Sequence, residues 1–113
     1  MQIYLGVAQR GEGKAGELGF PTANITLADE SLSGIYAAIV EVGGKKYYAA
    51  VYANQSRKLL EAHLLDFSGE LYGHNITIEL RKKIREDARF ESEQVLRDAI
   101  AKDVSDVRGY FAS

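Results

Sequence analysis

Residues 35–52 read IYAAIVEVGGKKYYAAVY, and this stretch decides the fold class. Its two halves are rich in β-branched and aromatic residues, which favour strands. Between them lies the dipeptide Gly43-Gly44, and a two-residue glycine loop between two apolar runs is typical of a β-hairpin. We therefore predict two antiparallel strands, at residues 35–42 and 45–52, joined by a tight turn.

Four further segments read as strands, and they lie at residues 3–9, 22–27, 59–65 and 74–84. The last is the clearest, because Ile76, Ile78 and Leu80 alternate with polar residues, which predicts one buried and one solvated face. Six short strands that follow one another closely indicate a mainly β fold. Closure into a small antiparallel barrel would remove the exposed edges of an open sheet.

The last twenty residues have a different period and predict a helix. Ser92 is a suitable N-cap. Apolar residues then recur every three or four positions, at Leu96, Ile100, Val104, Val107 and Phe111. This stripe predicts a helix that packs on the sheet, with Gly109 as the residue that ends it. No linker or repeat interrupts the chain, so we expect residues 1–113 to form a single domain.

Composition restricts the class of protein. The chain has 113 residues, of which 46% are hydrophobic and 27% charged, and this excludes a disordered chain or a coiled coil. It has no cysteine, which excludes disulfides and thiolate metal sites. The net charge of −2 argues against a nucleic-acid partner, and no apolar run reaches the ~18 residues of a membrane helix. We expect a cytoplasmic monomer without a membrane partner.

Residues 11–16 spell GEGKAG, which fits the pattern G-x-G-x-x-G. A dinucleotide fold needs a long helix directly after this pattern, and residues 17–21 (ELGFP) cannot begin one cleanly. It is not a Walker A loop either, because Glu17 follows the last glycine. Two interpretations remain: a flexible loop whose backbone N–H groups approach phosphates, or an ordinary irregular turn.

Thr22 and Asn24 follow the single proline of the chain, Pro21. In an extended segment their side chains point to the same side. A hydroxyl and an amide oxygen together are hard donors that suit Mg²⁺. The alternative is a turn in which both side chains bond to the local backbone.

Glu61 lies in the apolar strand at residues 59–65, whose alternation puts Leu59, Glu61, His63 and Leu65 on one face. A carboxylate among leucines is costly to bury unless it is hydrogen-bonded or used in chemistry. Glu61 is therefore either a buried base or a solvated residue. His63 is expected to be a packed structural histidine. The basic run at residues 81–85 is expected to be solvated, since acidic neighbours nearly cancel its charge.

Taken in order, these motifs resemble the riboflavin kinase family. The resemblance rests on residues 6–13 (GVAQRGEG), 18–25 (LGFPTANI), 34–37 (GIYA), 61–67 (EAHLLDF), 71–73 (LYG), 84–86 (IRE) and 90–92 (FES). It covers nearly the whole chain, and the PTAN and EAHLLDF blocks are the most specific parts. The connection at residues 54–58 is shorter than the Asn-Ile-Gly-x-x-Pro-Thr-Phe stretch that the family often has.

The resemblance implies a fold, a reaction and a set of site residues. The fold is a six-stranded Greek-key barrel with a C-terminal helix, and the reaction transfers the γ-phosphoryl group of ATP to the 5′-hydroxyl of riboflavin, giving FMN and ADP. By resemblance, the nucleotide phosphates would contact Gly11, Gly13, Lys14, Gly16, Thr22 and Asn24. Thr22 and Asn24 would hold Mg²⁺, and Glu61 would be the base. The flavin side would include Arg85, Phe90 and Leu96.

Two other classes of function stay open at this point. One is a non-catalytic module that binds flavin or nucleotide with the same fold. The other is a small barrel that binds single-stranded nucleic acid, with Tyr47, Tyr48 and Tyr52 as stacking platforms. Many bacterial members of the family also carry an N-terminal adenylyltransferase domain that makes FAD, and a free-standing kinase would stop at FMN.

Overall fold

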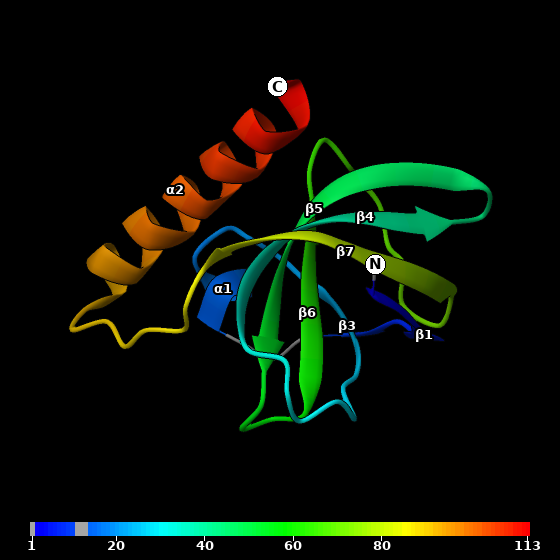
Figure 1. The fold of residues 1–113 in the computed structure, drawn as a ribbon, viewed down its shortest axis with the longest axis horizontal. Coiled ribbons are helices and arrows are strands. Elements are labelled where there is room, and N and C mark those ends of the chain that lie inside the picture. The colour runs from blue at the N-terminus through cyan, green and yellow to red at the C-terminus, as the bar shows by residue number, and fades with distance from the viewer. Residues whose placement is uncertain (1, 11–13) are drawn as a thin grey trace.

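Seven strands form one curled antiparallel sheet in the computed structural model, which describes residues 2–10 and 14–113 (Figure 1). Across the sheet their order is β1 (Gln2–Val7), β7 (Asn75–Arg85), β4 (Gly34–Val42), β5 (Lys45–Asn54), β6 (Leu59–Leu64), β3 (Ala23–Thr26) and β2 (Gln9–Arg10). The strands β4, β5 and β6 are consecutive, and β7 returns to lie beside β4. This is the order of a Greek key. The mainly β antiparallel fold is therefore confirmed.

The number of strands differs from the predicted six, because the first predicted strand divides at Ala8. The segment before Ala8 is β1, which pairs with β7, and the segment after it is β2, which pairs with β3. A straight strand cannot pair with both edges of a sheet, so the chain changes partner at this residue. Ala8 is buried and bonds to the backbone of Gly73 and His74 instead. The sheet thus curls so far that its two edge strands, β1 and β2, are separated in the chain by Ala8 alone.

The hairpin at Gly43-Gly44 forms as predicted. Val42 pairs with Lys45, and the two glycines have φ angles of 58° and 80°. Positive φ at both central residues is the geometry of a type I′ turn, which matches the twist of the flanking strands.

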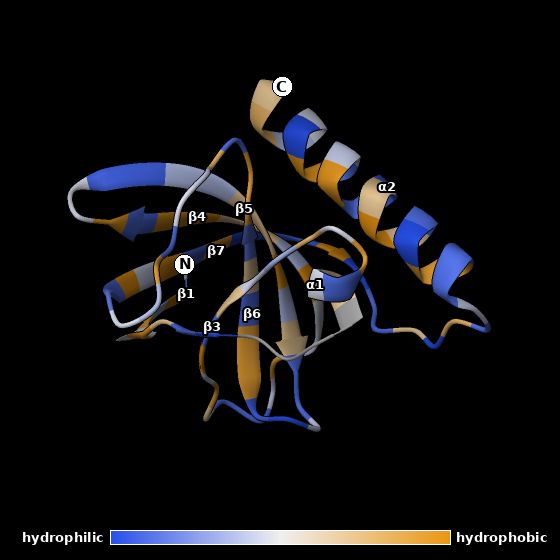
Figure 2. Ribbon diagram, turned by 180° about the vertical axis from the view of Figure 1, so that it is seen from behind, coloured by the Kyte–Doolittle hydropathy of each residue, from blue (hydrophilic) through white to orange (hydrophobic). Residues whose placement is uncertain are grey.

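Alternation along the strands separates two faces of the sheet. In β5, Ala49, Val51 and Ala53 join the main core inside the curl. The residues between them, Tyr52 among them, lie on the outer face. The outer face is the one on which the long helix packs, as Figures 1 and 2 show from opposite sides.

The helix α2 (Glu93–Ala112) begins after Ser92, whose Oγ accepts a hydrogen bond from the Val95 N–H at 3.2 Å. Its Val107 is fully buried and packs with Ala37 of β4 and with Leu65, the residue after β6. Hydrophobic and hydrophilic residues alternate along the helix in Figure 2, as one buried stripe requires. Among the described helices, none is long and apolar enough to cross a membrane.

The predicted end of this helix at Gly109 is wrong. The helix continues through Gly109 to Ala112. Phe111 stacks on Tyr48 of the sheet, with ring centroids 4.0 Å apart, and this contact holds the last turn in place. Packing beyond a glycine outweighs the cost of about 1 kcal/mol that the glycine imposes on a helix.

A second helix, α1 (Lys14–Glu17), lies where an irregular glycine segment was expected. Phe20 N–H donates to the Ala15 carbonyl at 2.8 Å, and Gly19 has φ +96°, so the turn closes in the left-handed way typical of a helix end. A four-residue helix is not stable alone. Because it is so short, its sequence shows no helical period, and it depends on the rest of the fold for its stability.

Candidate active site

The candidate site begins with a row of residues that crosses five strands. Asn24 lies opposite Glu61, Glu61 opposite Tyr52, Tyr52 opposite Ile35, and Ile35 opposite Arg85. Directly opposed residues share one face of a sheet. The row therefore places four polar side chains on the outer face, beside α2: those of Asn24, Glu61, Tyr52 and Arg85.

A cavity of about 400 Å³ lies over this row, between the sheet and α2. Its polar side includes Thr22, Asn54, Glu61 and His63. Its apolar side includes Ile35, Ala50, Phe90, Leu96 and Ile100. The volume and the mixture of an apolar wall with few polar groups are those of a small-molecule site.

Glu61 is buried and hydrogen-bonded. Glu61 is only 6% exposed, and its Oε2 accepts a hydrogen bond of 2.7 Å from Asn54 Nδ2. The structure thus decides between the two sequence interpretations: Glu61 is not a solvated surface residue. A carboxylate buried at the wall of a cavity is a candidate general base.

Thr22 and Asn24 lie on the same face as Glu61, as the extended reading predicted. Thr22 lines the cavity. Asn24 is 1% exposed, and neither its Oδ1 nor its Nδ2 has a hydrogen-bond partner among the described residues. A buried amide without partners costs about 1–3 kcal/mol. Such an amide is typical of a group that a ligand completes, and its oxygen and the Thr22 hydroxyl fit Mg²⁺.

The alternative of locally bonded turn side chains is not seen for Asn24. The described residues also contain no cluster of three or more His, Asp or Glu that could hold a metal ion. A cation at this place would therefore be held by neutral oxygens and by the phosphates that it accompanies.

His63 connects the segment before β3 to β6. Its Nδ1 lies 2.8 Å from the Pro21 carbonyl oxygen, and since a carbonyl only accepts, Nδ1 carries the proton. The ring of Phe20 meets the His63 ring edge-on, with centroids 5.5 Å apart. The expected structural role is thus observed, and it has a consequence for the site, because His63 holds the backbone next to Thr22.

The predicted phosphate loop is only partly described. Gly11 and Gly13 lie outside the described residues. Lys14 begins α1, and Gly16 is an exposed residue of that helix. The neighbouring Ala15 lines the cavity, so α1 lies at its edge.

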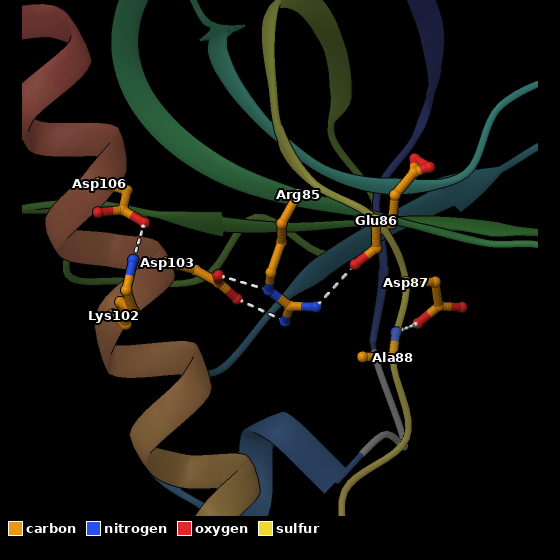
Figure 3. A network of polar contacts seen from close by, with 7 residues as sticks. All are labelled: Arg85, Glu86, Asp87, Ala88, Lys102, Asp103 and Asp106. Atoms are coloured by element: carbon orange, nitrogen blue, oxygen red, sulfur yellow. Dashed lines mark hydrogen bonds and ion pairs between the residues drawn. The ribbon is translucent and has the colours of Figure 1, made fainter.

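All three predicted flavin residues line the cavity. Arg85 donates from Nε and Nη2 to the two carboxylate oxygens of Asp103 on α2, at 2.7 and 2.8 Å, and from Nη1 to the Glu86 carbonyl (Figure 3). Its guanidinium lies over the ring of Phe90, 5.4 Å from the centroid. The hydrogen bonds to Asp103 raise the pKa of Arg85. Arg85 therefore shapes the wall as part of an ion pair.

Tyr52 closes the floor of the cavity toward the segment before α2. Its hydroxyl donates to Asp87 Oδ2 at 3.0 Å. Burial, together with this hydrogen bond, raises the pKa of Tyr52 to about 12. The phenol therefore stays neutral near pH 7 and ties β5 to Asp87.

Four residues of the site were not predicted as such: Tyr52, Asn54, Asp87 and Asp103. Asn54 alone had a local signal, since it begins the shortened connection. The others reach the cavity through strand register and helix packing, which no local pattern encodes.

The structure also bears on the basic run and the tyrosines. Arg81, Lys82 and Lys83 are exposed, as expected, and Lys83 pairs with Glu86, but the prediction is wrong for Arg85, which is half-buried because it pairs with Asp103. Tyr47 packs edge-on against Phe67, and Tyr48 stacks on Phe111. Both rings therefore pack against other side chains of the protein.

A smaller cavity of about 90 Å³ lies next to the first. Thr22 and His63 line both cavities. Leu71 and Tyr72 from the turn after β6 line the second one. The two cavities therefore meet at Thr22.

Comparison with known proteins identifies a family. The family model "Flavokinase", described as riboflavin kinase, matches residues 3–111. A bifunctional riboflavin kinase/FMN adenylyltransferase of Pseudomonas fluorescens is 35% identical over 111 residues, which cover 90% of this chain and 36% of the relative. The chain spans about a third of the length of the bacterial relatives that it matches.

Two solved structures share the fold. The crystal structure of riboflavin kinase from Trypanosoma brucei aligns with a TM-score of 0.69 at 27% identity, over 98% of this chain and 80% of that one. A crystal structure of a macrolide-efflux protein from Streptococcus pneumoniae aligns with a TM-score of 0.79 at 25% identity, over 94% of this chain and 38% of that one.

Proposed function

The chain belongs to the riboflavin kinase family, and we propose that it transfers the γ-phosphoryl group of ATP to the 5′-hydroxyl of riboflavin, giving FMN and ADP. One observation carries this proposal. Asn24, Glu61 and Tyr52 form a row across adjacent strands, so that the buried carboxylate at the cavity wall lies opposite the buried amide of Asn24, which has no partner among the described residues, and Thr22 lines the same cavity. A module that only binds flavin has no need of a buried base at this place.

The two cavities suggest how the substrates approach each other. The larger one has an apolar side of aromatic and aliphatic residues that suits the isoalloxazine ring, and the ribityl chain would extend toward Glu61. The nucleotide would enter from the side of the smaller cavity. Thr22 borders both cavities, so the transferred phosphoryl group would pass close to it.

Glu61 would accept the proton of the 5′-hydroxyl as that oxygen attacks the γ-phosphorus. In phosphoryl transfer the protein acts chiefly by positioning and by charge stabilisation, so the base gives part of the rate enhancement, ~10²–10⁴-fold in general. The apolar side of the cavity would help to exclude water, which would otherwise compete as the acceptor.

Thr22 and Asn24 would hold Mg²⁺ through their side-chain oxygens. When bound, the ion would neutralise the negative charge of the phosphates. His63 would keep the Thr22 backbone in place through its bond to Pro21. Gly11, Gly13, Lys14 and Gly16 would cover the phosphates, and Arg85, Phe90 and Leu96 would border the flavin.

The proposal also covers the oligomeric state and the location of the protein in the cell. We expect a monomer that works in the cytoplasm, where ATP is available, without a nucleic-acid partner, since the net charge is −2. Light scattering of the purified chain would test the monomer.

The deciding experiment is chromatography of FMN formed from riboflavin, Mg²⁺ and ATP, with CTP and GTP in parallel. We expect FMN with one nucleotide preferred. The variant Glu61→Gln should lower kcat by ~10²–10⁴-fold and leave ATP affinity nearly unchanged, because the amide keeps the shape but cannot accept the proton. Lost ATP affinity with normal turnover at saturation would refute the role of Glu61. No FMN with any nucleotide, while riboflavin still binds by fluorescence quenching, would instead indicate a binding module.

A further inference from the structure

We infer that Asn54 is a positioning residue that fixes the carboxylate of Glu61 in one orientation for the reaction. This inference rests on the proposed function and adds a residue to it. Asn54 and Glu61 are both buried, and Asn54 Nδ2 lies 2.7 Å from Glu61 Oε2. Asn54 is the last residue of β5, and its side chain reaches diagonally across to the neighbouring strand β6.

The bonds around Asn54 determine which way its amide points. Its Oδ1 accepts the Arg57 N–H at 3.2 Å and the Ser56 hydroxyl at 2.9 Å. A backbone N–H can only donate, so the atom facing it must be the amide oxygen. The NH₂ group therefore faces Glu61, where it can only donate.

The tight turn after β5 makes this arrangement rigid. Gln55 Nε2 donates to the carbonyl oxygens of Asp29 and Leu32, at 2.7 and 2.6 Å. Lys58 closes the turn with φ +57°, and its carbonyl accepts the Leu27 N–H at 2.9 Å. The short connection of residues 54–58 is thus anchored to the segment that follows β3. It holds Asn54 without the longer loop that the family often has.

The two carboxylate oxygens of Glu61 therefore have different surroundings. Oε2 is occupied by the Asn54 amide, whereas Oε1 accepts no hydrogen bond from another described residue. Oε1 is then the oxygen left for the substrate hydroxyl. Catalytic groups must be held within about 0.5 Å and 10–20° of the productive geometry, and a glutamate with three rotatable bonds does not hold itself there.

A double-mutant cycle tests the inference, with kcat and KM measured for wild type, Asn54→Ala, Glu61→Gln and the double variant. If Asn54 acts through Glu61, Asn54→Ala should lower kcat by about 10- to 100-fold, with the KM values changed less than about threefold. In the Glu61→Gln background the same change should lower kcat less than about twofold, because the base it positions is already gone. Equal fold-losses in both backgrounds would overturn the inference.

Asn54→Asp is the second variant, in case Asn54→Ala does not fold. It keeps an acceptor for Arg57 N–H and Ser56, removes the donor toward Glu61, and places a second carboxylate beside that group. We expect a loss of kcat as large as that of Asn54→Ala. Normal kcat for Asn54→Asp would contradict the positioning role.

Tyr4→Phe is the control, since it removes a partly buried hydrogen bond, from the Tyr4 hydroxyl to Asp29 Oδ2 at 2.8 Å, at a residue that lines neither cavity. It should lower the melting temperature while kcat of the folded protein stays within about twofold of wild type. A loss of kcat as large as that of Asn54→Ala would show that loss of stability alone lowers kcat, and it would overturn the inference.

A nuclear magnetic resonance measurement separates this inference from the proposed function. The side-chain ¹⁵NH₂ signal of Asn54 is assigned by its disappearance in Asn54→Asp, and it should move in Glu61→Gln. If wild type forms no FMN but the signal moves, the function fails and the Asn54–Glu61 contact stands. If wild type forms FMN and the signal does not move, the contact is absent and the inference fails.

Discussion

The ion pair between Arg85 and Asp103 gives a prediction that can be worked from the structure. Asp103 is the only buried charged residue of α2 among those described, with its side chain 5% exposed, and the Arg85 side chain is 28% exposed. The change Asp103→Ala leaves a half-buried guanidinium without its two carboxylate bonds. Breaking a buried pair costs about 3–5 kcal/mol, and access of water to Arg85 places the expected loss near the lower end, at about 3 kcal/mol. For a domain of this size, that lowers the melting temperature by about 12 °C.

The same helix offers a matched control, visible in Figure 3. Asp106 pairs with Lys102 at 2.8 Å, but these side chains are 39% and 74% exposed. An exposed i,i+4 pair contributes about 0.3–0.5 kcal/mol, so Asp106→Ala should lower the melting temperature by no more than about 2 °C. Thermal unfolding followed by circular dichroism measures both variants.

A double replacement sharpens the test. Arg85→Met with Asp103→Leu removes both charges and should recover much of the stability lost by Asp103→Ala, because apolar residues of similar volume can replace a buried pair. It should lower riboflavin affinity relative to wild type, since Arg85 borders the cavity. Equal melting temperatures for Asp103→Ala and Asp106→Ala would refute the reasoning that burial makes the first pair matter.

Two further predictions concern the strands that carry the site. Gly34 has φ +92°, and a Cβ there would lie 2.5 Å from the Arg85 carbonyl oxygen, so Gly34→Ala should lower the free energy of unfolding by about 3 kcal/mol. Gly43 also has a positive φ but lies in open space, so Gly43→Ala should lower that free energy by only about 1 kcal/mol. Equal losses for the two variants in urea unfolding would contradict this reasoning. Burial raises the folded-state pKa of Tyr52 to about 12, so the contribution of Tyr52 to the free energy of unfolding is fully present below pH 10 and is lost as pH rises toward 12. Tyr52→Phe should therefore lose less stability than wild type between pH 10 and 12. Parallel curves of stability against pH for the two proteins would count against the Tyr52–Asp87 bond.

Much of the fold could be read from local pattern. The hairpin around Gly43-Gly44 and the alternation in β7 follow from period-two sequences, which encode a strand and its buried face directly. Ser92 also begins its helix as predicted. The errors lie where tertiary contacts decide: Ala8 divides a strand because the sheet curls, and Phe111 extends a helix past Gly109 because it stacks on Tyr48.

The same distinction applies to the site. Alternation placed Thr22 with Asn24, and Glu61 with His63, on common faces from sequence alone. Which residue of one strand faces which residue of the next depends on register, and register is set by turns and by the packing of the whole sheet. Asn24 opposite Glu61, and Asn54 turned toward it, are results of that register.

The sequence by itself therefore determined the strands and their faces, the helix start, and the residue types that carry the chemistry, because these depend on neighbours one to four positions apart. The tertiary structure decided the seventh strand, the cavity, the ion pair of Arg85 with Asp103, and the bond from Asn54 to Glu61. Those features join residues from different elements, and only the balance of burial and hydrogen bonding over the folded chain brings them together.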